Sequence, residues 1–146
     1  MNKTDENKLV EDIFTVKDLD PGNKTPFRNV SRVHFTSEYG LEMELDINTQ
    51  IYPVAIGSKL FIKTILSQNT RNAYTKDELA KISEKDNFEY VMYGVVFEIE
   101  EPSDQEIIIY GSFGGLIMKL KGQKASLASF RREGPEARFY LLIRKA

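Results

Sequence analysis

The chain has very few of the side chains that enzymes use as nucleophiles, bases or metal ligands. Among its 146 residues there is one histidine and no cysteine. The missing thiols exclude disulfide frameworks, zinc ribbons, iron–sulfur clusters and thiol catalysis, and a single imidazole excludes multi-histidine metal sites. His34 lies between Val33 and Phe35, a setting that favours a structural or surface histidine over a general base.

Three carboxylates at alternate positions are the remaining candidates for chemistry. Glu42, Glu44 and Asp46 share one face of a predicted strand and could bind a hard cation, as in a metal-dependent hydrolase. Charges at this spacing are more typical of a solvated strand face. We therefore predict no catalytic residue, no metal ligand and no cofactor.

Basic side chains gather toward the C-terminal end. The net charge is −2, but residues 1–118 carry 12 basic and 20 acidic side chains, whereas residues 119–146 carry eight basic and two acidic ones. A nucleic-acid-binding protein usually has a dominant basic footprint, which the whole chain lacks. The basic end could still contact phosphates or an acidic partner, or it could be a solvated strand. The candidate nucleic-acid contacts are Lys119, Lys121, Arg138 and Arg144.

Strands must position these side chains, because period-two hydrophobic patterning dominates the sequence. From residue 41 to residue 51, every odd position is apolar or Thr and every even position is polar. This alternation indicates a strand with one buried face. Further strands are predicted at residues 12–16, 30–35, 60–66, 88–99, 106–120 (interrupted by glycines) and 139–143.

Only two segments depart from the strand pattern. Residues 67–87 are polar and carry a helix-capping signature, which predicts a short helix near 76–83 inside a long mobile loop. Residues 125–130 predict one helical turn. No apolar run approaches the ~18 residues of a membrane span, so we expect no membrane partner. The chain is predicted to be one all-β domain over residues 1–146, a closed antiparallel Greek-key barrel of about eight strands and of the oligonucleotide/oligosaccharide-binding (OB-fold) type.

Two predicted strands are apolar on both faces, although a small barrel has only one interior. Alternation over residues 90–97 predicts the odd positions inside, which leaves Tyr90 and Met92 outside. A second apolar face indicates a partner surface, and paired glycines let a neighbouring backbone approach closely. Alternatively, the chain's own loop or N-terminal segment covers this face, and the glycines only turn a hairpin. The predicted partner interface comprises Tyr90, Met92, Tyr93, Phe113, Gly114, Gly115, Leu116 and Met118.

Six blocks of the sequence together suggest a family. They are residues 10–21, 30–34, 46–54, 88–94, 113–118 and 140–145. In this order they resemble, nearly end to end, the small common subunit of eukaryotic nuclear RNA polymerases I, II and III, the eighth by size. Two positions depart from the usual pattern of that family, with Phe113 in place of Tyr and Ile117 in place of Leu.

The resemblance implies a non-catalytic OB-fold subunit that packs on the largest polymerase subunit within the multisubunit complex. It also implies a location in the nucleus and nucleolus, no small-molecule substrate, and an often disordered loop between the fourth and fifth strands, where the polar segment 67–87 lies. The residues alone leave two other functions open. One is a free-standing barrel that binds single-stranded nucleic acid through exposed aromatic side chains and the basic end, and the other is the metal-dependent hydrolase.

Overall fold

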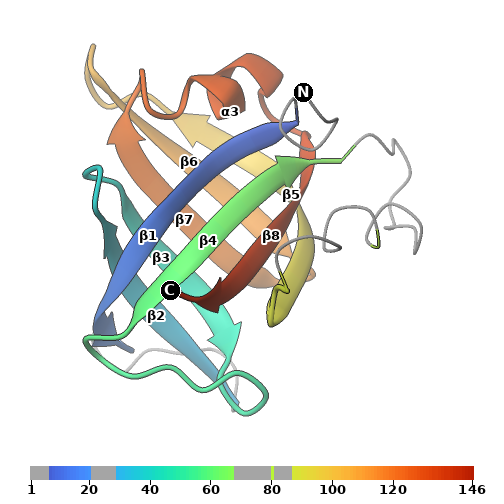
Figure 1. Ribbon diagram of the computed structural model, residues 1–146. Helices are drawn as coiled ribbons and strands as arrows, with labels where there is room; N and C mark the ends of the chain where they lie inside the picture. Colours follow the sequence, from blue (N-terminus) through green and yellow to red (C-terminus); the bar gives the residue numbers. More distant parts are fainter. Residues whose placement is uncertain (1–6, 21–28, 68–79, 81–86) are drawn as a thin grey trace.

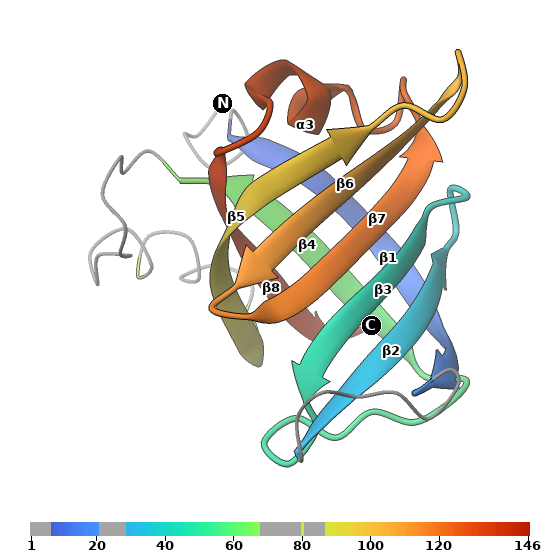
Figure 2. The ribbon, with the colours of Figure 1, turned by 180° about the vertical axis from the view of Figure 1, so that it is seen from behind.

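Eight antiparallel strands and one short helix make up the computed structural model, which describes residues 7–20, 29–67, 80 and 87–146. Figure 1 shows the strands wrapped around a common interior, and Figure 2 shows the same barrel from behind. The elements are β1 (Lys8–Leu19), β2 (Val30–Ser37), β3 (Glu42–Asn48), β4 (Lys59–Leu66), β5 (Tyr90–Glu100), β6 (Glu106–Phe113), β7 (Leu116–Gln123), α3 (Ala128–Glu133) and β8 (Arg138–Lys145).

The strands close into a barrel in the order β1-β2-β3-β7-β6-β5-β8-β4, and β4 pairs again with β1. Every ladder between neighbouring strands is antiparallel. The predicted all-β closed antiparallel barrel is therefore confirmed, and the architecture is consistent with an OB-fold type. Closure leaves no long free strand edge, which is how such barrels avoid edge-to-edge aggregation.

The barrel interior is filled by the alternate side chains that the period-two pattern places inside. On β3, Met43, Leu45 and Ile47 are buried, as the alternation predicts. Helix α3 lies across one end of the barrel (Figure 1). Its Phe130 is buried and meets Phe139 of β8 edge to face, with 5.4 Å between the ring centroids. The helix therefore closes this end of the core with an aromatic plug.

The outer surface of β4, β8 and β5 carries a second, smaller apolar cluster. Ile65, Tyr140 and Leu142 are buried there, and the partly buried Phe88, Val91 and Tyr93 pack against them. Strand β8 is consequently buried on both faces over Phe139–Ile143. Its near-continuous apolar sequence follows from this double burial.

Some predicted bounds differ from the observed ones. Helix α3 begins at Ala128, after a turn, whereas the sequence predicts one helical turn over residues 125–130. Most of the predicted mobile loop 67–87 and of the predicted helix near 76–83 lies outside the described residues. Within the described part of the chain, no helix combines the length and the apolar character that crossing a membrane requires.

Candidate partner interface

Four of the eight predicted interface residues point into the barrel. Tyr90, Met92, Phe113 and Met118 all belong to the hydrophobic core, with at most 8% of their surface exposed. These side chains therefore offer very little surface to a partner while the barrel is closed. The predicted outward orientation of Tyr90 and Met92 is therefore wrong.

The error arises in β5, where both faces are apolar, so the alternation does not tell which set of positions faces the barrel interior. The even positions face inward up to Val96, and a β-bulge between Val96 and Glu98 then shifts the register. Gly94 is one of these inward positions, and a Cβ there would overlap the carbonyl oxygen of Ser112 and the ring of Phe113. The glycine thus fixes the inward phase, because no side chain fits between β5 and β6 at this point.

The other four predicted interface residues remain accessible, at least in part. Gly114 and Gly115 form the two-residue turn of the β6–β7 hairpin, with φ of 64° and 103°. Two consecutive positive φ angles suit a tight hairpin turn, which explains the glycine pair locally. Leu116 is half-buried at the same turn, and Tyr93 lies on the outer face of β5, with its ring 4.8 Å from that of Tyr140.

The predicted nucleic-acid contacts do not form one groove. Lys119 and Lys121 lie on β7, whereas Arg138 and Arg144 lie on β8, and two strands separate β7 from β8 in the barrel. Lys121 also pairs with Glu106 at 3.6 Å, and the guanidinium of Arg144 lies 4.4 Å from the ring centroid of Phe61. A continuous basic track, as single-stranded nucleic acid requires, is therefore missing from the described surface.

The carboxylate of Asp46 already has partners, which removes it from the candidate cation-binding set with Glu42 and Glu44. Asp46 is fully buried and accepts hydrogen bonds from Nε and Nη2 of Arg32 at 2.8 and 3.1 Å. It also accepts a hydrogen bond from the backbone N–H of Ile117 at 3.0 Å. The hydrogen bond to Asp46 raises the pKa of Arg32. Among the described residues, no three His, Cys, Asp or Glu side chains lie together as metal ligands.

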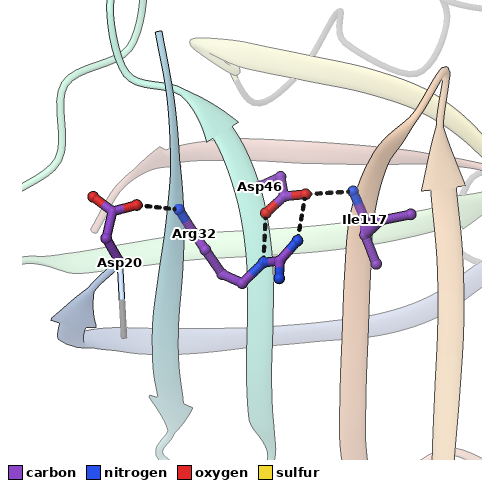
Figure 3. A network of polar contacts seen from close by, with 4 residues as sticks. All are labelled: Asp20, Arg32, Asp46 and Ile117. Atoms are coloured by element: carbon purple, nitrogen blue, oxygen red, sulfur yellow. Dashed lines mark hydrogen bonds and ion pairs between the residues drawn. The ribbon is translucent and has the colours of Figure 1, made fainter. Parts of the chain in front are cut away.

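These contacts form a clamp across the seam between β3 and β7, shown in Figure 3. The β3–β7 ladder ends at Leu45 and Met118. At the next position, the side chain of Asp46 accepts the Ile117 N–H, so a carboxylate continues the pairing where the backbones diverge. The backbone N–H of Arg32 in turn donates to the carboxylate of Asp20, just beyond the end of β1. The clamp thus connects the first three strands to β7.

A shallow pocket of about 210 Å³ lies on the outer face of β2, β3 and β7. His34 stands opposite Glu44 in the β2–β3 ladder, and Glu44 stands opposite Lys119 in the β3–β7 ladder. The sequence patterns do not predict that these side chains lie together. Only the pairing of β3 with β7, which is distant in the sequence, brings them to one place. The lining residues are His34, Glu42, Met43, Glu44, Lys119 and Lys121.

A polar and aromatic cluster fixes the loop between β3 and β4. The ring of Tyr52 stacks on that of Tyr90 at 5.3 Å between centroids, and the Tyr52 hydroxyl donates to Oε1 of Glu89 at 2.7 Å. Burial raises the pKa of Tyr52, and the hydrogen bond to Glu89 adds to this rise. The same hydrogen bond, with one from the backbone N–H of Lys145, lowers the pKa of Glu89.

On either side of Tyr52, this loop exposes a large apolar side chain, which the sequence pattern does not predict. Ile51 is 69% exposed and Ile56 is 63% exposed. The alternation over residues 41–51 predicts Ile51 on the buried face. However, β3 ends at Asn48, whose carbonyl accepts the backbone N–H groups of Ile51 and Tyr52 in a turn. A turn ends the two-residue period, so alternation no longer tells which side is buried.

Comparison with known proteins gives a consistent picture over almost the whole chain. The profile of the family described as RNA polymerase Rpb8 matches residues 11–145. The subunit RPABC3 of DNA-directed RNA polymerases I, II, and III from Saccharomyces cerevisiae is 34% identical over 151 residues, covering 95% of this chain and 99% of the yeast protein.

Two further relatives are similar to the same extent. The corresponding rpabc3 subunit of Dictyostelium discoideum is 37% identical, with 94% of this chain and 97% of that protein covered. Subunit 8B of DNA-directed RNA polymerases II, IV and V from Arabidopsis thaliana is also 37% identical, with 94% and 95% covered. Among solved structures, the cytoplasmic molybdate-binding protein ModG aligns over 92% of this chain and 89% of its own, with a TM-score of 0.33 and 13% identity, too low to inform function.

Proposed function

The chain belongs to the RNA polymerase Rpb8 family, and on this premise we propose that it supports transcription by packing on the largest subunit of DNA-directed RNA polymerases I, II and III. It is a non-catalytic, structural subunit of a multisubunit polymerase. It therefore contributes contacts to the assembly and leaves the chemistry of polymerisation to other chains.

The observation that carries this proposal is the extent of the match. The yeast relative is covered over 99% of its length and the Dictyostelium relative over 97%. A match of this extent includes the core and the surface of the barrel alike. A shared fold alone would say little about function, because OB-type barrels serve many unrelated functions.

Affinity purification tests the subunit assignment. A tagged copy of the full chain is expressed in its own cells, native complexes are captured, and the co-purifying chains are identified. We expect the largest polymerase subunits in stoichiometric amount, and cross-linking of the captured complex should join this chain to the largest one. Recovery of the tagged chain only as a monomer would contradict the proposal.

The tip of the β6–β7 hairpin is the part of the predicted interface that we retain for docking. Gly114 is exposed and a Cβ at this position would meet nothing within 4 Å. A partner backbone can therefore approach the turn closely, with the half-buried Leu116 beside it. Tyr93 on the neighbouring β5 adds the kind of aromatic contact that interface cores favour.

Two substitutions at Gly114 separate docking from folding. Its φ of 64° lies in the left-handed region, where Asn and Asp are the best tolerated side chains. Gly114→Asn should leave both the fold and the assembly nearly unchanged. Gly114→Asp has almost the same shape but places a charge at the contact, so it should weaken incorporation into polymerase. Equal incorporation of both variants would place the interface elsewhere.

We also propose a nuclear location, because the relatives are named as subunits of DNA-directed RNA polymerases I, II, and III and of II, IV and V. A chain that serves polymerase I as well would be found in the nucleolus in addition to the nucleoplasm. Imaging of a fluorescent fusion, with a nucleolar marker as reference, tests this part. Signal that excludes the nucleolus would restrict the chain to the other polymerases.

A further inference from the structure

The pocket on the outer face of β2, β3 and β7 has an arrangement of charge that the barrel itself uses only in part. Along β3, Glu42 and Glu44 form an acidic stripe, and along β7, Lys119 and Lys121 form a basic stripe beside it. The ladder places Glu44 opposite Lys119 and Glu42 opposite Lys121. Adjacent strands lie about 4.8 Å apart, so the two stripes are close neighbours.

Opposite charges in facing positions usually pair across a ladder. In the described part of the chain, Glu42, Glu44 and Lys119 nevertheless have no ion pair within 4.0 Å, and Lys121 pairs with Glu106 of β6 instead. His34 continues the Glu44–Lys119 row onto β2, and Tyr110 continues it onto β6. Glu42, Glu44 and Lys119 are therefore available to another molecule, and Lys121 would exchange its exposed ion pair with Glu106 for a new partner.

We propose that this pocket, which we call the charge-paired pocket, docks a peptide segment of a larger polymerase subunit that carries one acidic and one basic side chain about 5–7 Å apart. The basic side chain would lie against Glu42 and Glu44, and the acidic one against Lys119 and Lys121. An extended segment supplies this spacing with residues two apart, and a helix with residues four apart. The inference rests on the proposed function, because it assumes that the chain assembles with polymerase.

Electrostatic complementarity decides between the possible occupants. A nucleic-acid backbone would meet the two lysines but would be repelled by the acidic stripe beside them. A purely basic peptide would be repelled by the lysines. Only an occupant with both charges satisfies both stripes, and such complementarity is what fixes partner choice and register at interfaces.

The pocket is also continuous with the proposed docking hairpin. Lys119 follows Ile117 on the outer side of β7, and Ile117 pairs with Ser112 next to the hairpin turn. A partner seated on the turn at Gly114 could thus extend along β7 into the charge-paired pocket. The charged side chains of the pocket are carried by two strands of a closed barrel, so the backbone of the pocket needs little ordering when a partner binds.

A charge swap tests the proposal. Wild-type chain and a variant are co-expressed with different tags, polymerase is purified through another subunit, and the ratio of the tags gives the relative incorporation. Glu44→Lys and Lys119→Glu should each lower incorporation by at least roughly tenfold. The double variant Glu44→Lys/Lys119→Glu restores an opposite pair within the barrel but places one charge of the wrong sign in each stripe, so it should be incorporated no better than the single variants.

Controls keep each outcome decisive. The swap Arg132→Glu/Glu133→Arg on α3 also exchanges an exposed ion pair, but outside the pocket, and should compete as well as wild type. Thermal unfolding of the purified chains reports whether each variant folds. The neutral pair Glu44→Gln/Lys119→Gln, which adds no repulsion, repeats the test if a reversal unfolds the barrel, and it should also lower incorporation.

Three results would overturn the proposal. Rescue by the double variant would show that the two residues serve only each other. Wild-type incorporation of all the variants would show that the pocket is solvated in the complex. Normal incorporation with loss of binding to a labelled single-stranded oligonucleotide would assign the pocket to nucleic acid. Failure of the wild-type chain to enter polymerase would instead refute the proposed function, so the two failures are distinguishable.

Discussion

Replacing Asp46 by alanine should destabilise the barrel by about 3 kcal/mol. Asp46 is fully buried and has three donors, two from Arg32 and one from the backbone of Ile117. Removing the carboxylate leaves the Ile117 N–H without an acceptor, which costs about 1–2 kcal/mol. It also removes two charge-assisted hydrogen bonds from Arg32.

The exposure of Arg32 sets the size of the second contribution. Breaking a fully buried ion pair costs roughly 3–5 kcal/mol, because the remaining charge stays desolvated. The side chain of Arg32 is 33% exposed, so water can replace part of the lost interaction and the cost falls to about 1–2 kcal/mol. Together the two contributions give about 3 kcal/mol, a large fraction of the roughly 5–15 kcal/mol that stabilises a typical domain.

Urea unfolding of the purified chain, with a double-mutant cycle, measures this prediction. The single variants Asp46→Ala and Arg32→Ala are compared with the double variant, and a coupling free energy of about 1–2 kcal/mol is expected. The midpoint of thermal unfolding should fall by roughly 10 °C for Asp46→Ala. Glu42→Ala, at an exposed position of the same strand, is the matched control and should change stability by less than about 0.5 kcal/mol. A cost below about 1 kcal/mol for Asp46→Ala would refute the view that the clamp holds the β3–β7 seam.

Two further predictions concern β5 and the segment before it. Gly94→Ala should destabilise the barrel by about 1–3 kcal/mol, since the added Cβ would overlap the ring of Phe113. Urea unfolding measures this loss, and an unchanged unfolding midpoint would mean that β5 and β6 separate freely. Hydrogen bonds lower the pKa of Glu89 in the folded state. The stability that Glu89 contributes to the fold is therefore present above its unfolded pKa of about 4.3, and it is lost as the pH falls through its folded pKa. Glu89→Gln should therefore reduce the loss of stability between about pH 5 and pH 3, measured by unfolding at both pH values, and a variant as acid-sensitive as wild type would contradict this linkage.

The sequence predicts the barrel well because the information for it is local. The alternation over residues 41–51 identifies the buried face of β3 correctly at Met43, Leu45 and Ile47. The segment 60–66 nearly coincides with β4, which spans Lys59–Leu66. In both cases a single strand carries its own signal, either as a period of two or as a β-rich run between turn residues.

The candidate site is predicted less well because it depends on relations between distant strands. On β5 the apolar residues occupy both faces, so only the close fit of Gly94 against β6 decides that Tyr90 and Met92 point inward. The lysines of β7 meet the carboxylates of β3 only because these two strands pair in the closed barrel. Neither relation leaves a periodic trace within one strand, so both become visible only when the register is known.

Strand β8 has a consequence for how the protein is made. It inserts between β4 and β5, with ladders to both, and it lies beside β4 in Figure 1. During synthesis, the edges of β4 and β5 therefore stay open until β8 leaves the ribosome. Open edges attract other chains and chaperones, and closure through such non-local pairing is intrinsically slow. A product that ends before β8 would retain both open edges, so closure of the barrel distinguishes chains that contain β8 from chains that lack it before assembly begins.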